Sequence, residues 1–195
     1  MTQSYNHPVA VSASPRLDNL LVSLSLNLAE ESVAALEDAS GLAGSAALAL
    51  LALEEFLGDA HVGHLAEVLG LTHSGAVRLV TQLETAGFAE RRPGEDRRRV
   101  EVRLTAAGRR AAALARAARD AVVRETTGGL GPRDAAALER LLTKLVEARV
   151  EARAERRRES GDSRAWWCRT CDFAACGRPE GRCPAQMTAR RLSDQ

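Results

Sequence analysis

The sequence predicts a mainly α-helical fold with one small β-wing. Apolar residues recur at helical spacing over most of the chain, while one segment near residue 100 alternates apolar and polar residues with a period of two. A Pro-Gly turn sequence at 93–94 precedes that segment. Residues 59–108 therefore follow the order helix, tight turn, helix and hairpin, which is the order of a winged helix-turn-helix unit flanked by further helices.

Two helices are expected before this unit, over residues 14–58, after a flexible leader at 1–13. Ser14 can cap the first helix, and Pro15 suits its first turn. The second helix begins near Ser45, and its nearly continuous apolar run predicts a buried helix. The first helix has apolar residues at the spacing of one buried face: Leu17, Leu20, Leu21, Leu24 and Leu28.

Inside the unit, Gly70 and Leu71 make the turn, Thr72 or Ser74 caps the second helix, and Gly87 supplies its left-handed end. Four apolar side chains at i, i+3, i+4 and i+7 of this helix point inward, which leaves a polar face outward. They are Ala76, Leu79, Val80 and Leu83.

The outward face and the hairpin suit double-stranded DNA, with the second helix in the major groove and the wing beside it. Arg78 has the forked donors that fit guanine O6 and N7, a contact worth roughly 1–3 kcal/mol of base discrimination. Arginines at the wing tip can enter the narrow minor groove, with Asp96 orienting Arg98. The expected DNA-binding residues are His73, Ser74, Gly75, Arg78, Thr81, Gln82, Arg97, Arg98 and Arg99.

Two more helices are expected after the wing, over residues 109–158. The return strand of the wing turns Val100, Val102 and Leu104 inward, after which Thr105 caps a long Ala/Arg helix. Pro132 opens the last helix, which becomes entirely polar beyond Val150 and is there either a rigid arm or a loose tether. Its apolar face comprises Leu138, Leu141, Leu142, Leu145 and Val146.

Residues 15–155 resemble the MarR family of bacterial transcriptional regulators. The closest likeness is RRPGEDRRRVEVRLTAAG at 91–108, with an Asp-x-Arg pair and a strand ending in Leu-Thr-x-x-Gly. The resemblance implies a homodimer joined through the N- and C-terminal helices, a palindromic operator and usually repression. It also implies release of DNA by an oxidant or a small-molecule effector bound between the dimerising helices and the winged domain. Val77 and Gln82 depart from the family pattern, so base preference does not carry over.

The segment 159–195 holds all four cysteines, in the spacing Cys168-x2-Cys171-x4-Cys176-x6-Cys183. Four thiolates are a complete tetrahedral ligand set for zinc, which is the first choice. An iron–sulfur cluster, whose redox state would alter DNA binding, is the second, and a reversible disulfide among the thiols is the third. The segment is too short for a core of its own, so a metal would have to fold it. Its aromatic side chains, Trp166, Trp167 and Phe173, could cover the site or dock it on a partner subunit.

Composition excludes several other classes of protein. The 27 basic and 26 acidic residues nearly balance, and no stretch approaches the ~20 apolar residues of a membrane span, so we expect a cytoplasmic protein with no membrane contact. There is no HExxH motif, nucleotide loop or nucleophile elbow, so we expect no enzyme.

The alternative function is a winged-helix protein-interaction module whose metal-bound tail docks a partner protein. Loss of operator binding with the partner retained would distinguish the two.

Overall fold

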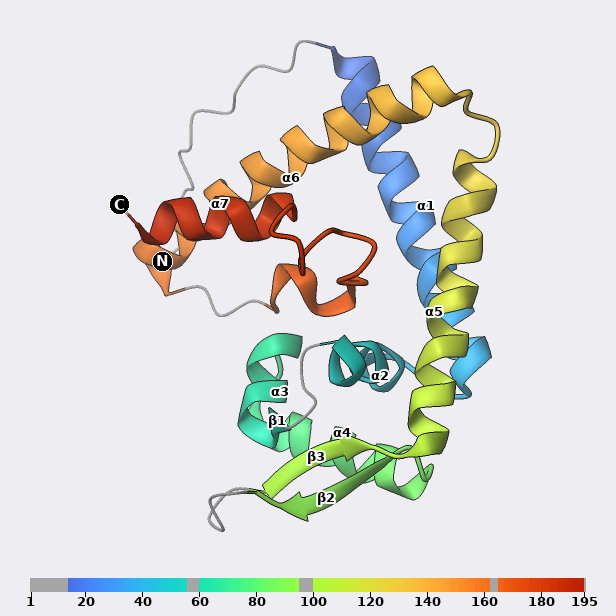
Figure 1. Cartoon of the computed structure of the whole chain (residues 1–195), viewed down its shortest axis with the longest axis vertical. Helices are drawn as coiled ribbons and strands as arrows, with labels where there is room; N and C mark the ends of the chain where they lie inside the picture. The colour runs from blue at the N-terminus through green and yellow to red at the C-terminus, as the bar shows by residue number, and fades with distance from the viewer. Residues whose placement is uncertain (1–13, 56–59, 95–99, 162–164, 195) are drawn as a thin grey trace, which may run out of the picture.

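A computed structural model describes residues 14–55, 60–94, 100–161 and 165–194 of the chain. As predicted, the described part is mainly helical with a small β-wing (Figure 1). Its helices are α1 (Pro15–Ser40), α2 (Ser45–Glu55), α3 (Val62–Leu69), α4 (His73–Thr85), α5 (Ala106–Thr127), α6 (Pro132–Ser160), the 3-10 helix η1 (Trp167–Thr170) and α7 (Pro184–Ser193). Its strands are β1 (Ala60–His61), β2 (Ala89–Pro93) and β3 (Val100–Leu104).

Local capping signals set most of the helix ends. Ser14 Oγ accepts a hydrogen bond from the amide of Leu17 at 3.3 Å, which starts α1 as predicted. Thr105 Oγ1 accepts from the Gly108 amide at 3.0 Å at the start of α5. Gly87 has the expected positive φ of 72° two residues after the end of α4. The positions of these helices therefore follow from short-range chemistry.

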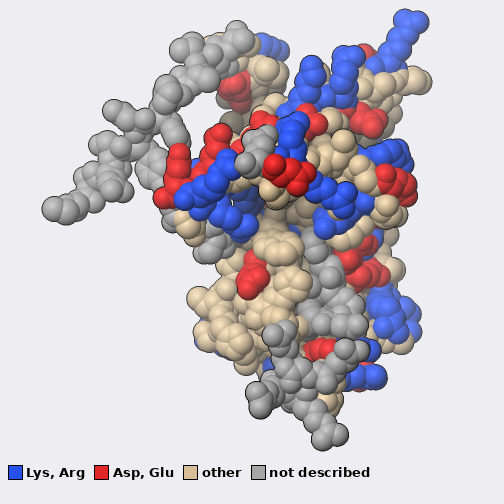
Figure 2. Space-filling model, turned by 60° about the vertical axis from the view of Figure 1, so that its left-hand side comes forward, with Lys and Arg blue, Asp and Glu red and all other residues tan. Residues whose placement is uncertain are grey.

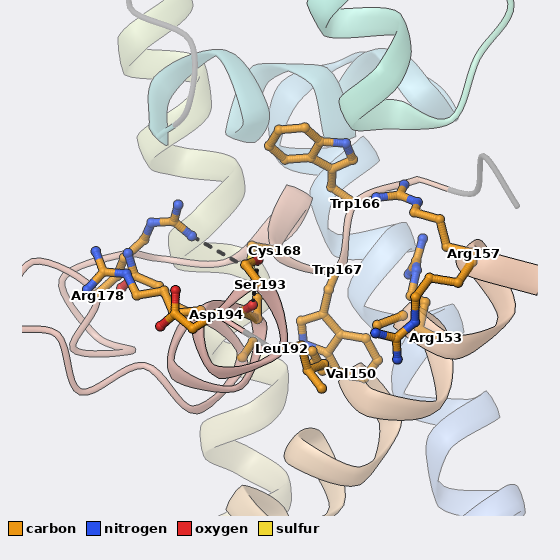
Figure 3. A pocket seen from close by; sticks show the side chains of 16 residues that line it. Val150, Arg153, Arg157, Trp166, Trp167, Cys168, Arg178, Leu192, Ser193 and Asp194 are labelled. Atoms are coloured by element: carbon orange, nitrogen blue, oxygen red, sulfur yellow. Dashed lines mark hydrogen bonds between the residues drawn. The ribbon is translucent and has the colours of Figure 1, made fainter. Parts of the chain in front are cut away.

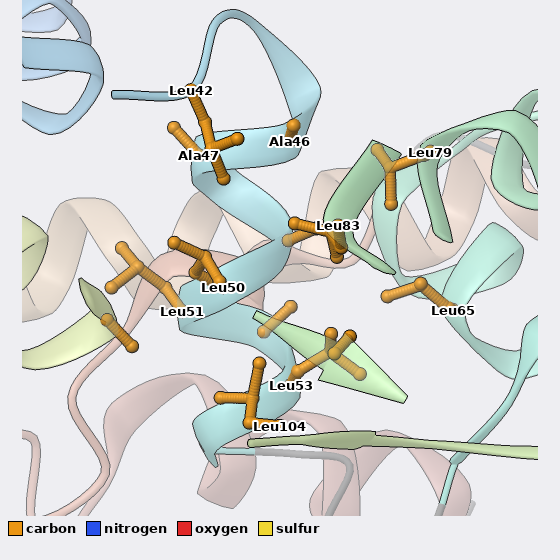
Figure 4. Packing of buried hydrophobic residues seen from close by; sticks show 14 of the residues in the cluster. Leu42, Ala46, Ala47, Leu50, Leu51, Leu53, Leu65, Leu79, Leu83 and Leu104 are labelled. Atoms are coloured by element: carbon orange, nitrogen blue, oxygen red, sulfur yellow. The ribbon is translucent and has the colours of Figure 1, made fainter. Parts of the chain in front are cut away.

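Helix α2 is the centre of the hydrophobic core (Figure 4). Nearly all of its side chains are buried, because α3, α4, α5 and β3 all pack around it. The predicted inward face of α4 is confirmed, since Ala76, Leu79, Val80 and Leu83 are all buried in this core.

The sheet has the order β1-β3-β2, with antiparallel pairs throughout. In the wing, Ala89 pairs with Leu104 and Arg91 with Val102. Val102 and Leu104 are buried as expected, but the prediction that Val100 points inward is wrong: it is 46% exposed. Val100 pairs with Pro93 at the far end of the hairpin, beyond the part of the sheet that α2 covers.

The apolar faces of α1 and α6 are not buried within one chain, contrary to the expectation for α1. Leu17 is 60% exposed, and α1 enters the core only near its C-terminal end, at Leu36. The apolar face of α6 is exposed as well. Helix α1 extends from the core to the opposite end of the molecule, and α6 runs across that end (Figure 1), so much of both faces stays exposed within the described chain.

Helix α6 continues without a break through the polar stretch beyond Val150, which is therefore a helical arm and not a tether. Helix α7 lies along α6, and the cysteine segment fills the space between α6 and α2 (Figure 1). Within the described residues, no single helix has both the length and the apolar character of a membrane span; α1 and α2 reach them only as a pair bent by 81°.

Candidate nucleic-acid interface

Helix α4 presents a polar face to solvent, and its first turn is held by Thr72. Thr72 Oγ1 accepts from the Gly75 amide at 3.1 Å, so Thr72 and not Ser74 is the cap. A Cβ on Gly75 would lie 3.1 Å from that same oxygen, so the glycine lets the capping hydroxyl stay close. The other side chains expected to contact DNA from this helix are exposed together on one face: His73, Ser74, Arg78, Thr81 and Gln82.

An arginine of the wing clamps this helix from the side. Arg91, in β2, donates through its backbone amide to Glu84 Oε1 at 3.1 Å, and its guanidinium pairs with the same carboxylate. The guanidinium also donates to the carbonyl of Val77 at 3.3 Å and to Thr81 Oγ1 at 3.2 Å. The helix and the wing therefore form one rigid surface, and the Thr81 hydroxyl already has a partner within the chain.

No sequence pattern predicted a role for Arg91. Its partners lie 7, 10 and 14 residues away in the chain, on a different element. Helical or strand periodicity carries no information about such a contact. The only available signal was a charge pattern, an acid on the outward side of the helix followed by arginines at the start of the wing.

The wing-tip arginines lie outside the described residues. Arg97, Arg98 and Arg99, together with Asp96, fall in the segment 95–99 that joins β2 to β3. Their role in DNA binding stays a prediction.

The four cysteine thiols lie within electrostatic reach of one another. A hydrogen bond from Cys171 is the largest cause that lowers the pKa of Cys168, to about 7, and the charge of Arg178 adds to it. The same hydrogen bond, together with burial and the other three thiols, raises the pKa of Cys171. Burial, followed by the proximity of Cys183, raises the pKa of Cys176. The chain thus gathers all four sulfurs, although they are 15 residues apart at the extremes.

The residues around these thiols include an arginine and two turn-forming glycines. Four thiolates around a divalent ion leave a net negative charge, and the Arg178 guanidinium lies 4.0 Å from Cys168 Sγ, stacked over Phe173 at 4.5 Å. Gly177 and Gly181 adopt positive φ angles, 71° and 69°, in the turns between the third and fourth cysteine. Among the described residues, however, no three His, Cys, Asp or Glu side chains stand in a metal-binding arrangement.

The cysteine segment docks on the turn of the helix-turn-helix. The amide of Trp166 donates to the carbonyl of Val68, near the end of α3, at 2.9 Å, and the indole meets the ring of His64 edge-on with centroids 5.5 Å apart. Ala165 packs directly against Gly70: a Cβ on that glycine would lie 2.6 Å from the Ala165 amide nitrogen. Trp166 thus packs against the helix-turn-helix of its own chain.

A charged cluster ties the same segment to α2 and α5. Arg116 pairs with Glu54 at 2.6 Å, with Glu55, and with Asp172 of the cysteine segment at 3.4 Å. Glu55 Oε2 in turn accepts from the Phe173 amide at 3.0 Å. Because these groups are partly shielded from solvent and share partners, the cluster positions the tail more firmly than a fully exposed ion pair would.

Comparisons with known proteins support the same architecture. Residues 40–99, which run from the end of α1 into the wing tip, match the MarR family. The solved structure of RV1404 from Mycobacterium tuberculosis is 24% identical, with a TM-score of 0.62 over 72% of this chain and 98% of that one. A MarR family protein from Bacillus stearothermophilus is 26% identical, with a TM-score of 0.60 over 67% and 90%. The YusO protein from Bacillus subtilis is 21% identical, with a TM-score of 0.60 over 70% and 99%. Among proteins of curated function, none matches the chain significantly.

These likenesses cover about 70% of this chain and nearly the whole of the similar structures. The family match spans the core helix, the helix-turn-helix and the first strand of the wing, where the exposed face of α4 and its Arg91 clamp lie. The chain therefore contains a MarR-like winged helix-turn-helix domain at residues 40–99, and it shares the fold of these solved structures over about 70% of its length.

Proposed function

We propose that the chain acts in the cytoplasm as a homodimeric repressor that binds a palindromic operator through α4 and the wing. The observation that carries this proposal is the exposed polar face of α4, fixed at its start by Thr72 and along its side by Arg91. A rigid helix with Arg78 and Gln82 exposed can enter a major groove without rearrangement.

The exposed apolar faces of α1 and α6 support the dimer. Each face presents a row of leucines to solvent on a long helix, which is unusual for a surface that stays uncovered. We assign a second copy of the chain as the occupant, because the family joins its subunits through these two helices. A two-fold dimer would place the α4 helices about one DNA turn apart, roughly 34–36 Å.

Replacing Arg78 by alanine is expected to weaken operator binding roughly tenfold or more, because the bidentate contact to guanine is lost. The operator would be selected from a pool of random-sequence duplexes, and affinity measured by fluorescence anisotropy at two salt concentrations. Arg140→Ala removes the same charge from an exposed position on the side of α6 opposite its apolar face and is the matched control. The wild-type titration should saturate at two chains per duplex.

Equal affinity of the Arg78→Ala and Arg140→Ala variants would overturn the base-reading role of α4. Failure of the wild-type chain to retain any duplex, even at low salt, would favour the alternative of a protein-interaction module.

We further propose that Cys168, Cys171, Cys176 and Cys183 hold one metal ion, with zinc as the first choice. The support is the donor set itself: four sulfurs gathered by one short segment, with an arginine beside one of them to offset the negative charge. Zinc in such a site would have no open position for substrate and would act as a structural clip for the tail. An iron–sulfur cluster remains the second choice and would make the tail redox-sensitive.

Metal analysis of anaerobically purified protein is expected to find about one zinc per chain, and about none after Cys183→Ser, since three thiolates bind zinc much less tightly than four. The Ser193→Ala variant, which changes an exposed hydroxyl of α7, should keep its zinc. Iron with acid-labile sulfide and a visible absorption band would show that the site holds an iron–sulfur cluster and not zinc. Protein with neither metal would leave only thiol oxidation for these residues.

A further inference from the structure

A cavity lies between α6, η1 and α7, and most of its lining residues follow residue 155 (Figure 3). Its volume is about 580 Å³, within the range of pockets that hold small ligands, roughly 300–1,000 Å³. Neither the DNA-binding surface nor the cysteine cluster needs this cavity, although Cys168 forms part of its wall.

One wall is apolar and includes both tryptophans of the chain. Trp167 points toward Val150 of α6, while Trp166 turns the other way, toward α3 (Figure 3). Ala185, Ala189 and Leu192 contribute the facing surface from α7. These side chains form a surface suited to a flat apolar group, since an indole offers a large face at little conformational cost.

The polar part of the lining is strongly basic. Arg153 and Arg157 stand on one side of Trp167 and Arg178 on the other (Figure 3), and the rim adds further arginines. Blue side chains gather over the part of the surface where α6 and α7 lie, with red ones among them (Figure 2). The cavity lining itself has one carboxylate, Asp194, against five arginines: Arg153, Arg157, Arg158, Arg178 and Arg190.

We propose that this cavity binds an amphipathic anion, with an apolar body against Trp167 and a carboxylate, sulfonate or phosphate facing the arginines of α6 and α7. Guanidinium groups suit such anions because they offer paired donors, and the apolar wall strengthens the attraction by excluding water. Ligand binding itself does not depend on the proposed function. Only the regulatory consequence, that the ligand acts as an effector, rests on it.

That consequence follows from Trp166, which lines the cavity and also contacts the helix-turn-helix. Its amide donates to Val68, its ring packs on His64, and the preceding Ala165 presses on Gly70. A ligand that orders the Trp166–Trp167 segment therefore also orders the turn between α3 and α4. Binding and DNA recognition become linked through one continuous set of contacts.

The test uses 1-anilinonaphthalene-8-sulfonate as the anionic probe and N-phenyl-1-naphthylamine as its uncharged counterpart. Because both tryptophans line this cavity, exciting them is expected to sensitise the emission of the bound anionic probe. The combined Arg157→Gln and Arg190→Gln variant should weaken binding of the anionic probe roughly tenfold or more and leave the neutral probe unchanged. Arg140→Gln, on α6 but outside both the cavity lining and the apolar face, should change neither.

Unsensitised emission would mean that the probe sits on the exposed faces of α1 and α6, and would overturn the site. Equal binding of the anionic probe to the wild-type and Arg157→Gln/Arg190→Gln proteins would overturn the anion specificity. The link to the helix-turn-helix is tested without DNA, by hydrogen exchange of residues 62–72 with and without the anionic probe: slower exchange is expected, and unchanged exchange would overturn the link. Since no step needs an operator, failure here is distinct from failure of DNA binding.

Discussion

Replacing Gly108 by alanine is expected to lower the free energy of unfolding by about 3–5 kcal/mol, a large part of the ~5–15 kcal/mol typical of a domain. Gly108 is buried in the first turn of α5, and a Cβ there would lie 1.9 Å from the carbonyl oxygen of Phe88. That oxygen belongs to the backbone and accepts from the Thr105 amide at 3.0 Å, so it cannot turn away as a side chain could. The added methyl group must push α5 away from the strand that begins the wing.

Urea unfolding followed by circular dichroism measures this loss. Gly129→Ala is the matched control, because its Cβ would meet nothing within 4 Å and its φ is not in the left-handed region. We expect that variant to remain within about 0.5 kcal/mol of the wild type. Similar losses for the two variants would show that α5 does not approach the wing as closely as the structure has it.

The Gly70→Ala variant is expected to release the cysteine segment from the helix-turn-helix as well as to strain the turn. Gly70 has a φ of 66°, which costs a residue with a Cβ roughly 1–2 kcal/mol. The Cβ would in addition lie 2.6 Å from the Ala165 amide nitrogen, so Ala165 and Trp166 must move. The Trp166 indole should then become more exposed, which shifts tryptophan emission to longer wavelength.

The Gly87→Ala variant separates the backbone strain of a left-handed residue from the steric clash with Ala165. Its φ of 72° is nearly the same, but nothing lies within 4 Å of the position its Cβ would take. We expect Gly87→Ala to lose stability without any change in tryptophan emission. If both variants shift the emission equally, or neither does, the tail does not dock on the turn.

The helix-turn-helix was predictable from the sequence because short-range rules determine it. The i, i+3, i+4 and i+7 spacing of Ala76, Leu79, Val80 and Leu83 placed the buried face of α4 correctly. Caps at Ser14 and Thr105, and the left-handed glycine at position 87, are contacts between residues only a few positions apart. Val100 was misplaced because alternation says which way a side chain points and not whether anything covers that position.

The contacts that organise the candidate sites depend on elements far apart in the chain. Arg91 reaches back to Thr81 and Val77 from a different element, and no periodicity marks that contact. Glu55 accepts a hydrogen bond from the amide of Phe173, which lies 118 residues further along the chain. Such pairs form only after the core has placed both partners.

The sequence by itself determined the winged helix-turn-helix, the exposed face of α4 and the grouping of four cysteines, because hydrophobic periodicity, capping and residue spacing are properties of local chain geometry. Only the tertiary structure decided where the polar arm of α6 and the cysteine segment lie. Their docking depends on the missing side chain at Gly70, on the shared ion pairs of Arg116 and on the packing of Trp166 against α3. Each of these contacts joins residues that are far apart in the chain. No periodic pattern in the sequence therefore predicts it.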